Sequence, residues 1–254
     1  MFYIAQLSLF LVITILLAAA TIVLGPFDPH GKRAYRINQF WTWLILRLAG
    51  VHLNVTGLQN IEPDKPYIFM VNHQSNIDIP VLIESLARFQ LRWIAKKELL
   101  WVPFFGWAMW ATKHIAVDRS DPMDAIRSLE RAKERLGAGI SIVIFPEGTR
   151  SHDGQLLRFK KGGFLLAAQS RAPIVPVAIK GSGRILPAGG WKLRSGVIEV
   201  FVDKPIAADN YRVGKLRVLS ETVRQVIAGH LDQSTPAHSE PTPTGAKRLE
   251  KRSA

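Results

Sequence analysis

The first 27 residues carry no charged side chain, and this limits how the chain can fold more than any other feature. Within residues 2–24 the only side chains outside the apolar set are Gln6, Ser8, Thr14 and Thr21. At about 1.5 Å per residue, a helix of this length extends about 35 Å, enough to cross a hydrocarbon core of about 30 Å. Gly25 and Pro26 would end it. We therefore expect a membrane-embedded helix at the N-terminus.

A cleaved signal peptide is the alternative, because the run AAAT at residues 18–21 offers small side chains. However, the segment has no basic start, and its apolar run exceeds the usual length of about 7–15 residues. Lys32, Arg33 and Arg36 follow the segment. The positive-inside bias then places the rest of the chain on the cytoplasmic face of the membrane.

A second apolar stretch, residues 39–53, is shorter and contains Arg47. Its pattern predicts a helix with one apolar face, formed by Trp41, Leu44, Ile45 and Leu48. Tryptophan and arginine suit a helix at the level of the lipid headgroups. An ordinary core helix fits the same pattern, and the sequence leaves both interpretations open.

From about residue 65, predicted strands alternate with predicted helices. Strands are expected at 65–72, 91–96, 114–119, 140–145, 172–181 and 196–206, and helices at 77–89, 124–139, 161–171 and 211–231. This order predicts an α/β fold in which helices flank a mostly central sheet. We expect membrane-anchoring helices over residues 1–55, a folded domain over 56–231, and a disordered tail over 232–254, which is rich in Pro, Ser, Thr and charge.

The balance of charge points to an anionic partner. There are 33 Lys and Arg against 20 Asp and Glu, a net charge of +13. Nucleic acid is the usual partner of so basic a chain, but the apolar N-terminus favours an anionic lipid. The chain has no cysteine, no phosphate-binding glycine loop, no HExxH and no GxSxG. Thiolate, zinc, NTP and serine-hydrolase chemistry therefore have no support.

The stretch VNHQSNIDIP, residues 71–80, places polar side chains where a predicted buried strand ends. Asn72, Ser75 and Asn76 suit the cap of the next helix. Asp78, five residues after His73, can fold back onto the imidazole, and a histidine held by a carboxylate at one nitrogen can accept a proton at the other. A purely structural capping role is the alternative for this pair alone.

A second polar cluster, FPEGTRS at residues 145–151, follows another apolar strand. Arg150 offers a forked donor for phosphate oxygens, and backbone N–H groups in such a turn can bind an anion. The run RFKKGG at 158–163 adds positive charge. A solvated surface turn is the alternative interpretation.

Together the two clusters resemble motifs of the glycerolipid acyltransferases that acylate lysophosphatidic acid. NHQSNID at 72–78 resembles the NHxxxxD motif of that family, and 145–151 resembles its FPEGTRS motif. AVDRS at 116–120 and IVPVAI at 174–179 resemble its second and fourth motifs. The resemblance covers residues 65–205, and the first and third motifs are the specific ones.

The resemblance implies the fold of these enzymes behind an N-terminal membrane-embedded segment, with residues 56–231 as the catalytic domain. It implies transfer of a fatty acyl group from acyl-CoA or acyl-carrier protein to the 2-hydroxyl of lysophosphatidic acid among membrane lipids, at a bacterial inner membrane. His73 would be the general base, oriented by Asp78, and backbone N–H groups would hold the oxyanion. The phosphate would be bound by Arg119 and Arg150 with Lys96, in a pocket shaped by Glu147, Gly148 and Thr149. No metal or organic cofactor is implied, because the thioester arrives activated.

Three alternatives stay open at this point. The acceptor could be glycerol-3-phosphate or another lysolipid, and a membrane-anchored adaptor for anionic lipid would need no catalysis. Nucleic-acid binding is disfavoured by the N-terminal segment. The apolar run at 99–110 would line an acyl groove, enter the bilayer or belong to the core.

Overall fold

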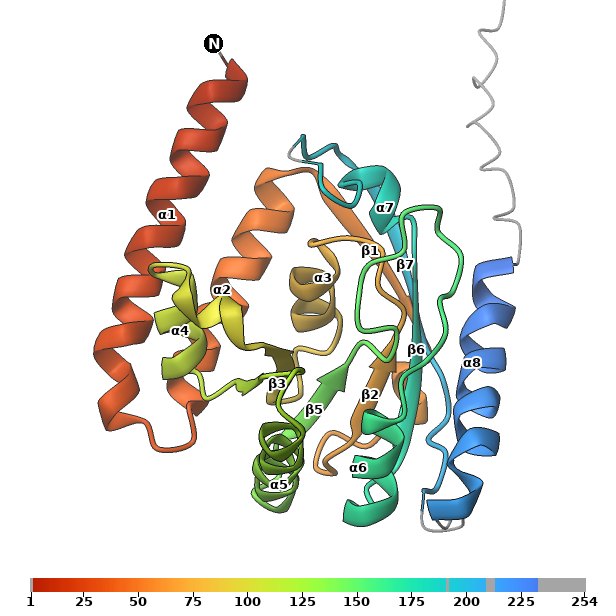
Figure 1. Cartoon of the computed structure of the whole chain (residues 1–254). Coiled ribbons are helices and arrows are strands. Elements are labelled where there is room, and N and C mark those ends of the chain that lie inside the picture. Colours follow the sequence, from red (N-terminus) through yellow and green to blue (C-terminus); the bar gives the residue numbers. More distant parts are fainter. Residues whose placement is uncertain (1, 191, 209–212, 233–254) are drawn as a thin grey trace, which may run out of the picture.

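A seven-stranded sheet forms the centre of the protein (Figure 1). The computed structural model describes residues 2–190, 192–208 and 213–232. The strands are β1 (Val51–Thr56), β2 (Ile68–Val71), β3 (Leu91–Lys96), β4 (Ile115–Val117), β5 (Ser141–Ile144), β6 (Ile174–Lys180) and β7 (Gly196–Val202). Their order is β1-β7-β6-β2-β5-β3-β4. The pairing of β6 with β7 is antiparallel, and the other pairings are parallel. The predicted α/β class with a central sheet is confirmed.

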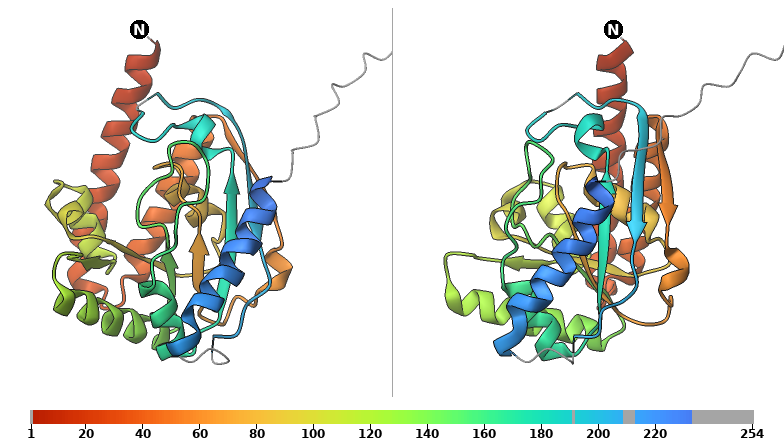
Figure 2. Two further views of the ribbon diagram at one scale, coloured as in Figure 1. Left: turned by 45° about the vertical axis from the view of Figure 1, so that its right-hand side comes forward. Right: turned by 90° about the vertical axis from the view of Figure 1, so that its right-hand side faces the viewer.

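Helices cover both faces of this sheet. They are α1 (Phe2–Leu24), α2 (Lys32–Leu48), α3 (Asp78–Ser85), α4 (Phe105–Ala111), α5 (Pro122–Gly137), α6 (Gly162–Ser170), α7 (Ser182–Ile185) and α8 (Leu216–Asp232). Short 3-10 turns are η1 (Gly25–Phe27), η2 (Leu58–Asn60), η3 (Lys97–Trp101) and η4 (Val213–Lys215). α8 crosses one face of the sheet, while α1 and α2 lie on the opposite side (Figure 2).

The two-residue period of the strands divides the core into two layers. Phe69 and Val71 of β2 point into the layer covered by α2 and α3. Their neighbours Ile68 and Met70 point into the layer covered by α5, α6 and α8. Successive side chains of a strand face opposite sides of a sheet. A continuous apolar run such as IFMV therefore fills both layers, as expected for a central parallel strand.

The parallel pairing of β2 with β5 brings the two polar sequence clusters together. Met70 lies beside Ile144 in this pair, so both strands end at the same edge of the sheet. The segments that follow, 72–77 and 145–151, therefore meet there. Ligand sites in open α/β sheets form at this carboxyl edge.

Two boundaries near the N-terminus differ from the prediction. The predicted end of the helix over residues 39–53 is wrong. α2 ends at Leu48, and residues 51–56 form β1 beside β7. Gly50, with φ of 66°, turns the chain between them. β1 crosses the expected boundary at residues 55/56, and the division into domains stays a prediction. The tail expected over 232–254 lies outside the described residues except for Asp232, the last residue of α8.

The N-terminal helix and α2 each pack on the domain along one side. Within the described residues, one helical segment, Ser8–Phe27, is long and apolar enough to cross a membrane. It leaves most of its surface uncovered, including Leu16 and Val23. α2 buries Tyr35 and Leu46 in the core and leaves other aromatic side chains exposed. A position at the lipid headgroups stays a prediction.

Candidate active site

His73 and Asp78 form a hydrogen-bonded pair at the end of β2. The Nδ1 atom of His73 lies 2.8 Å from Oδ2 of Asp78, the first residue of α3. The same oxygen accepts the backbone N–H groups of Gln74 and Ser75, each at 2.8 Å. Asp78 is buried, so these donors fix the direction of its carboxylate. With a proton on Nδ1, the Nε2 atom of His73 is free to act as an acceptor.

Residues 145–151 contact both the ring and the backbone of His73. The ring of Phe145 stacks on the imidazole with centroids 3.9 Å apart and an angle of 16°. The carbonyl of His73 accepts the N–H of Ser151 at 2.8 Å. Its N–H donates to Oε1 of Glu147 at 2.8 Å, and the other carboxylate oxygen of Glu147 accepts the N–H of Leu157 at 2.8 Å. Backbone and ring of the histidine are thus held from two sides.

The capping roles expected at 72–76 are replaced by tertiary contacts. α3 has no side-chain cap at its N-terminus. The amide of Asn72 instead bonds both backbone groups of Ile179 in β6, at 2.9 and 2.7 Å. The hydroxyl of Ser75 donates to the carbonyl of Leu186 at 2.6 Å. These side chains therefore fasten the His73 loop to the neighbouring strand and to the segment after α7.

Positive side chains from three segments approach the same place. Nη1 of Arg119 donates to the carbonyl of Gly148 at 2.6 Å, and Nη1 of Arg150 donates to Oδ1 of Asn76 at 2.8 Å. Lys96, at the end of β3, pairs with Glu98 at 3.0 Å. Each guanidinium uses one nitrogen in this hydrogen bond, so N–H groups remain to bind phosphate oxygens.

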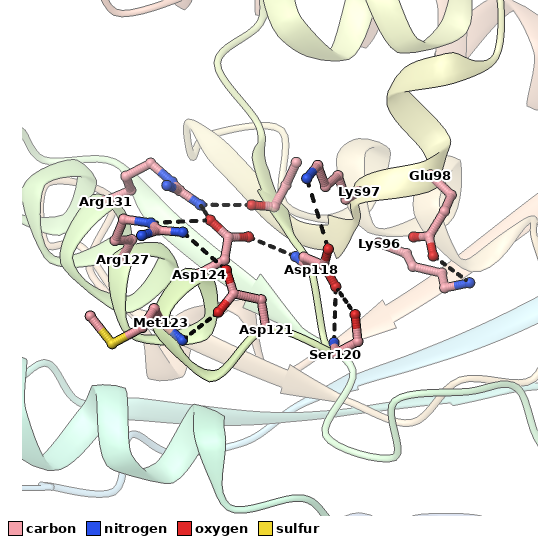
Figure 3. A network of polar contacts seen from close by, with 11 residues as sticks. Lys96, Lys97, Glu98, Asp118, Ser120, Asp121, Met123, Asp124, Arg127 and Arg131 are labelled. Carbon is pink, nitrogen blue, oxygen red and sulfur yellow. Dashed lines mark hydrogen bonds and ion pairs between the residues drawn. The ribbon is translucent and has the colours of Figure 1, made fainter.

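A network of carboxylates and cations shapes the loop that carries Arg119 (Figure 3). Oδ2 of Asp124, in the first turn of α5, accepts the N–H of Asp118 at 2.7 Å. Arg131 reaches the carbonyl of Ala116 at 2.8 Å and Asp124 at 3.4 Å. Asp118 in turn accepts the N–H of Ser120 at 2.9 Å. Asp118 and Asp124 therefore bond to these groups and not to the guanidinium of Arg119.

The candidate base and the three positive side chains line one cavity of about 380 Å³. Its polar end is formed by His73, Asn76, Lys96, Arg119, Gly148, Thr149 and Arg150. Its apolar lining, which we call the apolar end, comes from α1, α2, β3 and α4 and includes Leu17, Trp41, Trp93, Phe105 and Met109. The indole N–H of Trp41 donates to the hydroxyl of Thr14 at 3.0 Å and ties α2 to α1 along this wall.

The structure therefore brings together seven of the eight residues selected from the sequence. His73, Lys96, Arg119, Gly148, Thr149 and Arg150 line the cavity, and Asp78 contacts it through the imidazole. Glu147 is buried beneath them and is not among the described lining residues, so it reaches the site only through the backbone of His73. Burial raises the pKa of its carboxyl, against the effect of the two N–H donors.

Sequence reasoning missed the walls contributed by α1 and α2. Thr14, Leu17, Asn38 and Trp41 line the cavity, but no pattern distinguished them from lipid-facing or core residues. The apolar run at 99–110 contributes to both the cavity and the surface. Leu99, Phe105, Ala108 and Met109 line the cavity, and several side chains of the run, Leu99 and Phe105 among them, are exposed.

Residues 52–180 match the family described as Acyltransferase. A 1-acyl-sn-glycerol-3-phosphate acyltransferase of Pseudomonas aeruginosa is 33% identical over 248 residues, which cover 90% of this chain and 94% of that protein. A chloroplastic enzyme of the same name from Arabidopsis thaliana is 34% identical over 226 residues, 88% of this chain. The chain spans 61% of the length of that plant protein.

A solved structure shares the fold. The crystal structure of the 1-acyl-sn-glycerophosphate acyltransferase PlsC from Thermotoga maritima superposes with a TM-score of 0.70 and 26% identity. The match covers 92% of this chain and all of that one.

Proposed function

Because this chain belongs to the acyltransferase family, we propose that it transfers a fatty acyl group to the 2-hydroxyl of 1-acyl-sn-glycerol-3-phosphate. The donor is a thioester, acyl-CoA or acyl-carrier protein, and the product is phosphatidic acid. The observation that carries this proposal is that the imidazole of His73 and the guanidinium groups of Arg119 and Arg150 line one cavity.

In this proposal His73 acts as the general base. Asp78 holds Nδ1, so Nε2 takes the proton of the 2-hydroxyl as its oxygen attacks the thioester carbonyl. The resulting oxyanion is held by backbone N–H groups of the nearby turns. When the carbon–sulfur bond breaks, the thiolate takes the proton from the imidazolium. The ester, the free thiol and neutral His73 are then the products of one balanced cycle.

The remaining lining residues divide between the two ends of the acceptor. Arg119, Arg150 and Lys96 bind the glycerol phosphate, since guanidinium groups match phosphate oxygens in charge and geometry. The apolar end of the cavity receives acyl carbon chains, because Leu17, Phe105 and Met109 offer no polar side-chain partner. The uncharged helix α1 at this wall supports action on substrates delivered from a membrane, with the domain on the cytoplasmic face.

An acceptor panel tests the substrate. The purified protein in vesicles is given acyl-CoA or acyl-carrier protein, together with lysophosphatidic acid, glycerol-3-phosphate or lysophosphatidylethanolamine. We expect lysophosphatidic acid to be acylated fastest at equal concentration. Equal or faster acylation of another acceptor would move the proposal to that acceptor, and no transfer from either thioester would refute it.

The variant His73→Ala separates an enzyme from a lipid-binding adaptor. We expect transfer to fall by at least about 10²-fold while vesicle binding is retained. A matched control exists on α8. Nε2 of His230 lies 2.7 Å from Oδ2 of Asp203, and the imidazole stacks on Phe201. His230 is not among the residues that line the cavity. His230→Ala should leave transfer nearly unchanged. An equal effect of the two substitutions would argue against catalysis by His73.

A further inference from the structure

A cluster of aromatic side chains projects into solvent from η3 and α4. No charged residue occurs between Leu99 and Thr112. We call the following exposed residues the aromatic platform: Trp101, Val102, Phe104, Phe105, Trp107 and Trp110. Trp101 is 80% exposed, the largest fraction among the exposed apolar residues of the described chain. Contiguous apolar surface of this kind marks a site of interaction with a membrane or a protein.

The backbone holds these side chains outward. Phe104 adopts φ of 60°, a conformation that bulky side chains rarely take, and its ring lies 5.4 Å from that of Trp107. A Cβ atom at Gly106 would come within 2.2 Å of the carbonyl oxygen of Leu100, so only glycine permits this close turn. The inner side of α4 is occupied by buried Met109. The segment is therefore built to expose its aromatic side, since strain of this kind persists only where the surroundings enforce it.

The platform is continuous with the apolar N-terminal helix. α4 packs beside α1 (Figure 1). α4 also meets η1, the turn after α1, where a Cβ built on Gly25 would lie 2.8 Å from that of Ala111. Phe27, just past α1, is 76% exposed, and Val23 is also exposed. Exposed apolar side chains therefore lie on α1, on η1 and on the platform, which are elements in contact with one another.

A lysine at the edge of the platform indicates which kind of partner covers it. Nζ of Lys113 lies 4.6 Å from the centroid of the Trp110 ring. Lys97, at the other end of the segment, pairs with Asp118 at 3.8 Å, so Lys113 carries the argument. Tryptophan rings flanked by lysine are typical of the interface between lipid headgroups and acyl chains, where the ring enters the apolar layer and the ammonium group faces anionic headgroups.

We propose that η3 and α4 insert the aromatic platform into the membrane leaflet that holds α1, as a second anchor separate from that helix. The partner is a lipid surface containing anionic headgroups. Because Phe105 belongs both to the platform and to the cavity lining, this anchor places a wall of the cavity at the level of the lipid. The proposal concerns position alone and does not require the acyl transfer proposed above.

The absence of cysteine from the chain permits a direct test. Single-cysteine variants of the full chain, Trp101→Cys and Trp107→Cys, carry an environment-sensitive fluorophore and are reconstituted with vesicles of phosphatidylcholine and phosphatidylglycerol. We expect quenching by lipid-borne nitroxide and protection from aqueous iodide. Leu16→Cys on α1 is the positive control, and Val218→Cys on α8, 57% exposed, is the matched control that should be quenched by iodide alone.

Two results would overturn the proposal. In the first, labels at positions 101 and 107 behave like the label at 218 while the label at 16 is quenched from the lipid, which places the platform in water. In the second, the labels are protected from iodide but not quenched from the lipid, and a short bismaleimide joins two copies through position 101. A second copy of this chain would then cover the platform. Neither readout depends on enzymatic activity, so a failed acyl-transfer assay leaves the test intact.

Discussion

The buried carboxylate of Glu147 accepts the backbone N–H of His73 at 2.8 Å and so joins two clusters that lie 74 residues apart in sequence. Its second oxygen accepts the N–H of Leu157 at 2.8 Å. The glutamate of the 145–151 turn therefore positions the candidate base through the main chain.

Burial raises the pKa of Glu147 above its ordinary value of 4.5, so the folded protein keeps this proton to higher pH than the unfolded chain. The free energy of unfolding contributed by this group is therefore larger at low pH and falls as pH rises above 4.5. Glu147→Gln removes the titration and leaves an amide N–H₂ facing a backbone donor. We expect this variant to be less stable, with a stability that falls less steeply with pH than that of the parent. Unfolding in detergent micelles between about pH 4 and pH 8 measures both slopes, and parallel curves would contradict the assignment.

Asp78→Asn should lower acyl transfer by at least about 10²-fold, because the amide can donate to Nδ1 of His73 and favour the tautomer that lacks a basic Nε2. The rate constant under saturating donor and acceptor measures this effect. The double variant with His73→Ala should lose little more than His73→Ala alone, since the two residues act as one unit. If the fold-losses of the two single variants multiplied in the double variant, Asp78 would act independently of the imidazole. Asp203→Asn, in the second histidine–aspartate pair, is the control.

Arg119→Lys keeps the positive charge but removes the forked guanidinium group. This group can bind phosphate and donate to the carbonyl of Gly148 at the same time. A charge-assisted hydrogen bond is worth about 1.5–3 kcal/mol, so we expect KM for lysophosphatidic acid to rise about 10-fold or more. The kcat at saturating acceptor should change less, because the phosphate is bound equally in the ground state and the transition state. Lys65→Gln removes an exposed cation that pairs with Glu62, outside this network, as a control. A fall in kcat at constant KM would contradict a binding role.

Asp124→Asn tests the network that holds the Arg119 loop. The hydrogen bond from Asp118 lowers the pKa of Asp124, so its carboxylate is charged at neutral pH and pairs with Arg131 at 3.4 Å. Weakening this pair by about 1 kcal/mol should raise KM for lysophosphatidic acid about fivefold and leave kcat nearly unchanged. The matched control is Lys133→Gln, which breaks an exposed ion pair with Glu130 on the same helix. Equal kinetics in the two variants would show that the network does not position Arg119.

Much of the local structure was predictable from the sequence. Asp78 lies five residues beyond His73, so their contact depends on a short segment and its hydrogen-bonding chemistry. The alternation of strands and helices followed from hydrophobic periodicity, and the predicted family is confirmed by the match over residues 52–180. The end of α2 was missed because an apolar pattern continues from the helix into the edge strand β1 across Gly50.

The sequence by itself determined the uncharged N-terminal helix, the strand and helix periods, and the imidazole beside its carboxylate, because each depends on side chains within a few turns of one another. Only the tertiary structure decided that Arg119 meets Gly148, that Asn72 clamps Ile179, and that α1 and α2 close the apolar end of the cavity. Periodicity assigns each residue to a face of its element but does not select the neighbour of that element. The order of the seven strands and the docking of the helices depend on the simultaneous packing of two core layers, which join residues far apart in the chain.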